Sequence, residues 1–232
     1  MRISEVHMKT ITSFADFITV IQEAGFAMAG DNAEGIFSPS QFYSADIAWH
    51  TDKAETDPWI WRIRGVSEVQ GLFYGKVFLK KAGWITKDWY PYFIAVRREG
   101  KSLDELYAAG RVSYMEKEIY TLISETGPMS THEMKAALQI DKTQKYAFDS
   151  AITVLQMKLL LTIGGQTRKE SLAGDAYGWP TTVFCDVDAY IGEQMLQKAK
   201  HISVKEAKEK ITKQILQMNE DAMPKKIQKF IG

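Results

Sequence analysis

The chain is short of cysteine and of long hydrophobic runs, and each shortage excludes a class of protein. Cys185 is the single cysteine in 232 residues, so neither an intramolecular disulfide nor a cysteine-based zinc cluster can form. The longest apolar stretches are far shorter than a membrane span. The N-terminal letters MRISEVHMKT lack the apolar segment of a secretory signal. We therefore expect a cytoplasmic protein without membrane association.

The chain also lacks an excess of charge of either sign. Its 29 Lys and Arg residues balance 29 Asp and Glu residues. Many DNA-binding domains are strongly basic, because neutralising phosphates supplies much of their affinity. The balance therefore argues against tight non-specific DNA binding and leaves local basic patches open. The four histidines are scattered without metal-ligand spacing, and Gly164-Gly165 has no phosphate-loop context, so we expect neither a metal nor a cofactor.

What the chain has in abundance is helix-start signals. The capping box, a Ser or Thr followed three residues later by Glu, provides acceptors for two free amides at a helix start. It occurs at Ser102, Ser113, Ser130 and Ser203, and Asp141-Lys-Thr-Gln144 is a close variant. Together with the alternating, strand-like segment 71–79, these signals predict an α+β protein.

Residues 111–186 form the most orderly block. The apolar periodicity predicts helices at 114–125, 131–138 and 142–157, followed by short strands at 159–163 and 181–185. A polar, glycine-rich loop separates the two strands. Three helices followed by a two-stranded hairpin is the order of a winged helix-turn-helix domain.

The flanking regions complete a three-part organisation. Residues 1–110 form an N-terminal α+β region, in which we predict helices at 13–24, 90–98 and 103–109 and a hairpin from 71–79 and 83–86. Residues 30–58 look irregular because Gly, Asn and Pro recur there. A helix plus a hairpin is also the outline of a second, degenerate winged helix, and that alternative stays open. Residues 187–232 form a C-terminal helical extension, with helices at 187–200, 204–218 and from Pro224 onwards.

In a winged helix, the third helix and the wing are the expected contacts with DNA. The core stripe of helix 142–157 is Phe148, Ile152 and Leu155. The opposite face and the polar loop offer hydroxyl, phenol and cationic groups for phosphates and base edges. An ordinary solvated helix and a surface loop are the alternative. The candidates are Lys142, Thr143, Tyr146 and Ser150 on the helix, and Arg168 and Lys169 in the loop.

A second cluster combines aromatic and basic residues. Residues 57–100 hold eight basic and four acidic residues, interleaved with tryptophan and tyrosine. Such a stretch can stack bases and grip a phosphate backbone. The alternative, which we favour for most of the tryptophans, is an aromatic core with Asp57–Arg pairing and a basic helix C-terminus. The candidate pocket is Asp57, Trp59, Arg62, Tyr74 and Lys76, with Arg97 and Arg98 as further DNA contacts.

Several of these segments resemble the AlkZ-like (YcaQ-like) winged-helix proteins, particularly the short bacterial AlkZ-related members. The likeness covers most of the chain and implies the fold and an association with DNA. The larger members are DNA glycosylases of tandem winged helices, in which a Gln-apolar-Asp/Gln motif orients the attacking water. The segments that carry the resemblance are DPWIWRIR (57–64), LFYGKVF (72–78), GWITKDWYPYFIAVRR (83–98), LQMKLLLTIGG (155–165) and YGWPTTVF (177–184).

The glycosylase motif does not occur where the family carries it. Gln139-Ile140-Asp141 matches the letters but falls between the second and third helices of the later block, whereas the glycosylases carry theirs in the first winged helix. The corresponding region, 25–40, has no such triplet. We interpret 139–141 as a turn and helix cap, and we leave the catalytic residues unassigned.

Three functions follow from these observations. The leading hypothesis is a DNA-binding winged-helix protein, with weak or lesion-directed binding and no proven catalysis. The second is an active glycosylase for alkylated bases, in which Asp57 is the one carboxylate we would name for orienting water. The third is a ligand-binding or protein-binding scaffold that no longer contacts DNA. Oligomeric state and base specificity stay open.

Overall fold

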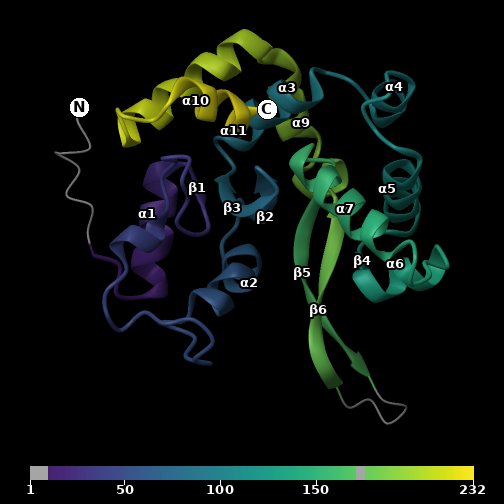
Figure 1. The fold of residues 1–232 in the computed structure, drawn as a ribbon, viewed down its shortest axis with the longest axis horizontal. Helices are drawn as coiled ribbons and strands as arrows, with labels where there is room; N and C mark the ends of the chain where they lie inside the picture. The colour runs from purple at the N-terminus through teal and green to yellow at the C-terminus, as the bar shows by residue number, and fades with distance from the viewer. Residues whose placement is uncertain (1–9, 171–175) are drawn as a thin grey trace.

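A computed structural model describes residues 10–170 and 176–232 of the chain and has an α+β architecture (Figure 1). Each half of the chain contributes one small antiparallel sheet with its own helices. The first unit begins with a helix that Ser13 caps through its side chain. Its elements are α1 (Phe14–Ala24), β1 (Phe26–Met28), the 3-10 helix η1 (Pro39–Phe42), α2 (Pro58–Glu68), β2 (Leu72–Phe78) and β3 (Lys81–Thr86).

The second unit repeats this plan with a longer hairpin. Two helices, α3 (Tyr90–Arg98) and α4 (Leu103–Ala108), connect the units. The strand order is β1-β3-β2 in the first sheet and β4-β6-β5 in the second, so the last strand is central in both. The elements of the second unit are α5 (Tyr114–Thr126), β4 (Met129–Ser130), α6 (Thr131–Ala137), α7 (Lys145–Met157), β5 (Leu161–Glu170) and β6 (Ala176–Asp186).

Four helices close the chain and cover the first unit. In Figure 1, α10 and α11 lie beside α3 at one edge of the molecule, opposite the β5–β6 hairpin. Phe230 of α11 stacks on Phe78 of β2 with ring centroids 4.0 Å apart. No helix in the described ranges is both long and apolar enough to cross a membrane. The four helices are α8 (Val187–Ile191), α9 (Glu193–His201), α10 (Val204–Met218) and α11 (Pro224–Ile231).

One hydrophobic core runs through both units. It joins the inner faces of α1 and α2 to those of α5 and α7. Trp61 of α2 and Phe148 of α7 are both fully buried in it. The predicted apolar stripes of the third helix therefore face the core, and a second cluster lies between α3 and the C-terminal helices.

Most predicted elements are present, and three predictions need correction. The pattern did not assign a helix to 58–68, where Asp57 caps the N-terminus and Pro58 takes the first position. The strands predicted at 159–163 and 181–185 extend through much of the intervening sequence, because backbone pairing continues from Leu161 to Glu170. The single helix predicted at 187–200 is interrupted at Gly192, whose φ of 76° ends α8.

Candidate nucleic-acid interface

The N-terminal turn of α7 presents a fully solvated polar surface. Lys142 and Thr143, just before the helix, are exposed, and the Tyr146 side chain is 86% exposed. Ser150, one turn further, is half-buried. Phe148 points the other way and is fully buried. The helix therefore has the two opposite faces that the sequence predicts, one in the core and one free for a partner.

Asp141 holds the turn of residues 142–144 that leads into α7, which begins at Lys145 and not at the predicted residue 142. One carboxylate oxygen accepts hydrogen bonds from the backbone amides of Thr143 at 2.7 Å and Gln144 at 3.0 Å. The Thr143 hydroxyl donates to the same oxygen at 2.6 Å. These hydrogen bonds lower the pKa of Asp141 below its ordinary value, and the bond from the Thr143 hydroxyl contributes most. Gln139 has a left-handed φ of 52°, so 139–141 form a turn, as the sequence predicts. The predicted helix cap is wrong, because the N-cap of α7 is Gln144, whose side chain makes no cap hydrogen bond.

The hairpin of the second unit extends away from the body of the molecule (Figure 1). Arg168 is exposed on β5. The side chain of Lys169 lies outside the described residues. Of the two predicted hairpin cations, the structure therefore places Arg168 on the surface.

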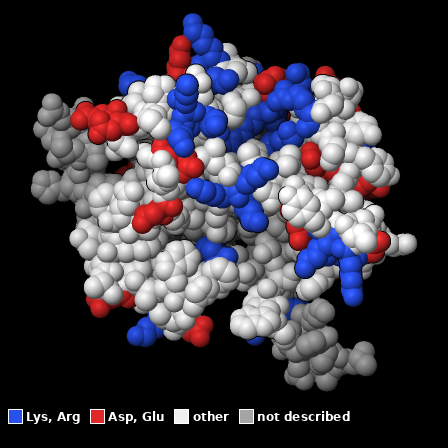
Figure 2. All heavy atoms as spheres, viewed as in Figure 1, with Lys and Arg blue, Asp and Glu red and all other residues white. Residues whose placement is uncertain are grey.

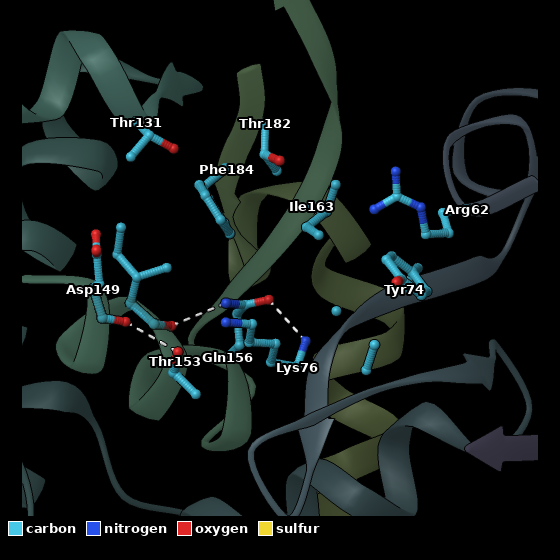
Figure 3. Close-up of a pocket in the computed structure, with 13 residues that line it drawn as sticks. Arg62, Tyr74, Lys76, Thr131, Asp149, Thr153, Gln156, Ile163, Thr182 and Phe184 are labelled. Atoms are coloured by element: carbon cyan, nitrogen blue, oxygen red, sulfur yellow. Dashed lines mark hydrogen bonds between the residues drawn. The ribbon is translucent and has the colours of Figure 1, made fainter. Parts of the chain in front are cut away.

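A cavity of about 330 Å³ lies between the two units. Figure 3 shows Arg62 and Tyr74 on one side, Asp149 on the opposite side and Gln156 between them. The first unit supplies the walls that contain Arg62, Tyr74 and Lys76, and the second supplies α7 and its sheet. Three of the five residues predicted for a pocket thus line one, namely Arg62, Tyr74 and Lys76.

Gln156 ties the two units together at the floor of this cavity. Its Oε1 accepts a hydrogen bond from the Lys76 backbone amide at 2.9 Å, and its Nε2 donates to the Ile152 carbonyl. A Cβ on Gly75 would lie 2.8 Å from that Oε1, so glycine permits the close approach. Sequence reasoning missed Gln156, although a glutamine inside the apolar run 155–163 is a usable signal.

Arg62 is stacked on the ring of Trp59. Its guanidinium carbon lies 3.2 Å from the Trp59 ring centroid, and its Nε donates to the Trp59 carbonyl at 2.8 Å. Partial burial lowers the pKa of Arg62, an effect that nearby Tyr74 and Asp57 partly offset. Burial also raises the pKa of Tyr74. Trp59 is 45% exposed whereas Trp61 is fully buried, so the aromatic-core alternative applies to Trp61 and not to Trp59.

Asp57 is a structural carboxylate. It is fully buried, and it accepts backbone hydrogen bonds from Trp59 at 2.8 Å and from the loop 50–52 at 2.7–3.2 Å. Burial raises its pKa, but the four amide bonds outweigh that effect and leave the pKa below its ordinary value. Asp57 does not line the cavity. With its oxygens occupied, it is badly placed to orient a water, contrary to the role considered for it from the sequence.

Arg97 and Arg98 lie in the interior, where they cannot contact DNA as expected. Arg97 is 8% exposed and donates to four backbone carbonyls, those of Val77, Met157, Phe230 and Ile231. Arg98 is 6% exposed and binds Asp188 and the Leu159 carbonyl. The sequence pattern missed this because α3 is covered by the second unit and by the C-terminal helices.

Charge on the visible face of the molecule is mixed. Figure 2 shows Lys and Arg side chains gathered over the upper and central parts of this face, with Asp and Glu around them. The basic groups do not form one continuous stripe. Any polyanion on this face would therefore be held by local contacts.

The fold and this surface define a class: an α+β protein with two units of like strand order, an exposed helix face and a projecting hairpin. The chain matches the family model described as "AlkZ related" over residues 11–232, and it belongs to that family. The search of curated proteins and the search of solved structures found no match.

Proposed function

We propose that residues 111–186 are a winged helix and that the protein binds duplex DNA through α7 and the β5–β6 hairpin. The observation that carries the proposal is the exposed N-terminal turn of α7 in a chain that belongs to the AlkZ-related family. The helix-strand-helix-helix-strand-strand order of the second unit supports it, since a recognition helix needs a rigid base. The first unit, with the same strand order, is proposed as a second, degenerate winged helix.

Lys142 and Arg168 act as phosphate contacts in this proposal. Both are exposed cations, one just before α7 and one on the hairpin. Contacts to phosphate position a protein without reading sequence, so each should contribute to affinity for any duplex. The balanced charge of the chain keeps the binding weak, and the phosphate contacts make it salt-sensitive.

The test is an anisotropy titration of a labelled duplex at two salt concentrations. We expect binding at low salt that weakens as salt rises, and each of Lys142→Ala and Arg168→Ala to reduce the log–log salt slope by about one. Lys205→Ala is the matched control, because this side chain is 87% exposed on α10, away from α7. Absence of binding by the wild type at low salt would overturn the proposal in favour of the scaffold function.

A second candidate, base excision, is favoured by one observation. Asp149 brings a carboxylate to the cavity between the units, where Lys135 pairs with it at 3.0 Å. Excision requires a group that orients water beside an extruded base. Base release from alkylated DNA by the wild type that disappears in Asp149→Asn, but survives in Asp141→Asn, would support this candidate. No release by the wild type would remove it.

A further inference from the structure

The β5–β6 hairpin contains a large bulge. Thr167 pairs with Thr181, and the next pair toward the tip is Lys169 with Tyr177. A single residue of β5, Arg168, therefore faces three residues of β6, Gly178, Trp179 and Pro180. Bulges re-aim side chains and are concentrated beside functional sites.

The bulge presents Trp179 to solvent. Its side chain is 93% exposed, more than any other exposed large hydrophobic side chain in the described ranges. Gly178 has a φ of 75°, a conformation that glycine adopts without strain, and Pro180 has no amide hydrogen to donate to the ladder. Both neighbours of Trp179 thus suit the interruption of pairing that turns the indole outward.

We propose that Trp179 is a wedge that stacks into a weakened base step of duplex DNA, with Arg168 beside it on the phosphate backbone. The inference rests on the proposed DNA binding and adds a preference for distorted duplex. Apolar side chains that enter a helix must unstack a base step, which costs less where stacking is already interrupted. A projecting hairpin can bring an indole to such a step, and the cation opposite it favours a polyanion over an apolar protein surface.

The wedge is tested by comparing two duplexes of one sequence, one intact and one with a single-nucleotide gap. We expect the wild type to bind the gapped duplex at least about fivefold more tightly, the lower end of what stacking on an aromatic side chain provides. Trp179→Ala should reduce this ratio to about one and leave affinity for the intact duplex within about twofold. Trp179→Phe should keep most of the preference. A 2-aminopurine beside the gap should lose emission with the wild type and not with Trp179→Ala.

Two matched variants separate the wedge from the proposed DNA binding itself. Tyr146→Ala should weaken binding to both duplexes alike and keep the ratio, and Tyr114→Ala, which removes a 65% exposed tyrosine on α5, should change neither. Equal affinity of the wild type for the two duplexes would overturn the wedge and leave DNA binding intact. Equal weakening of both duplexes by Trp179→Ala would also overturn it, because Trp179 would then be an ordinary contact. No binding of either duplex would overturn both proposals.

Discussion

Single carboxylates in this protein hold chain segments in place. Asp57 and Asp141 both precede helices, and both accept backbone amides on residues that follow them. They differ in burial, because Asp57 is enclosed and also binds a preceding loop, in which His50 and Asp52 have left-handed φ values near 60°. A non-glycine residue in that conformation is strained and persists only where its surroundings stabilise it. The carboxylate of Asp57 provides that stabilisation.

Asp57→Ala should lower the free energy of unfolding by about 1–2 kcal/mol through the lost cap, with an added loss from loop amides left without an acceptor. The pKa of Asp57 is lower in the folded protein, so its contribution is present above the pKa of the unfolded chain and is lost as pH falls through the folded value. Urea titrations at pH 7 and at pH 3 measure this. The stability difference between the wild type and Asp57→Ala should be smaller at pH 3 than at pH 7. An equal difference at both pH values would contradict the structural role of the Asp57 carboxylate.

Asp141→Asn should leave any release of alkylated bases unchanged. The reason is that its carboxylate accepts the amides of Thr143 and Gln144 in the turn before α7, which stabilises the anion and keeps it from a sugar carbon. The assay is base release from alkylated DNA by the wild type and by the variant, with circular dichroism to show equal folding. Release that vanishes only in the variant would restore Gln139-Ile140-Asp141 as a catalytic motif.

At the scale of elements, helix starts follow the local sequence closely. The capping boxes at Ser102 and Ser130 are complete, with the hydroxyl and the glutamate each accepting an amide. Ser113 and Ser203 accept the expected amide through their side chains. Helix α7 then separates two kinds of side chain within one turn, since Tyr146 is 86% exposed and Phe148 is fully buried.

Phe148→Ala should lower the free energy of unfolding by about 3–5 kcal/mol, because it removes a fully buried ring and leaves a cavity. Tyr146→Ala is the matched control on the same helix. It should change stability by less than about 0.5 kcal/mol while weakening DNA binding. Chemical denaturation of the wild type and the two variants measures these free energies of unfolding. A decrease below about 1 kcal/mol for Phe148→Ala would mean that α7 does not pack as described.

At the scale of the whole molecule, Arg97 connects parts of the chain that are remote in sequence. Its guanidinium bonds to carbonyls of β2, of the end of α7 and of α11. Burial lowers the pKa of Arg97, while four carbonyl acceptors favour its charged form. Arg97 is therefore one of the contacts that join the two units and the C-terminal helices.

Arg97→Leu should lower the free energy of unfolding by more than about 3 kcal/mol, since four buried carbonyls lose their donor. It should also increase amide hydrogen exchange in α11 more than in α5. Lys205→Leu is the control, because that lysine forms an exposed ion pair with Glu209 at 3.9 Å and its loss should cost about 1 kcal/mol or less. Equal exchange in α11 of the wild type and Arg97→Leu would show that the helices are held by other contacts.

The sequence by itself determined what depends on near neighbours. Caps, apolar stripes and glycine stops act over about four residues, so α1, α5, α6 and α10 and the turn at 139–141 could be predicted. The exposed turn of α7 belongs to this group, since a helix with one apolar face must leave the other outside. The α2 helix is not predicted, because its Trp-Ile-Trp-Arg-Ile segment favours a strand although Asp57 and Pro58 form a local helix start.

Only the tertiary structure decided which polar and aromatic groups are enclosed. Arg97 and Arg98 look like surface cations until α11 and the second unit cover them, and Trp59 and Trp61, two residues apart, end on opposite sides of α2. The cavity that unites Arg62 with Gln156 and the bulge that exposes Trp179 arise from pairing between distant segments. Burial is a property of what packs on a residue, and a local pattern does not contain that information.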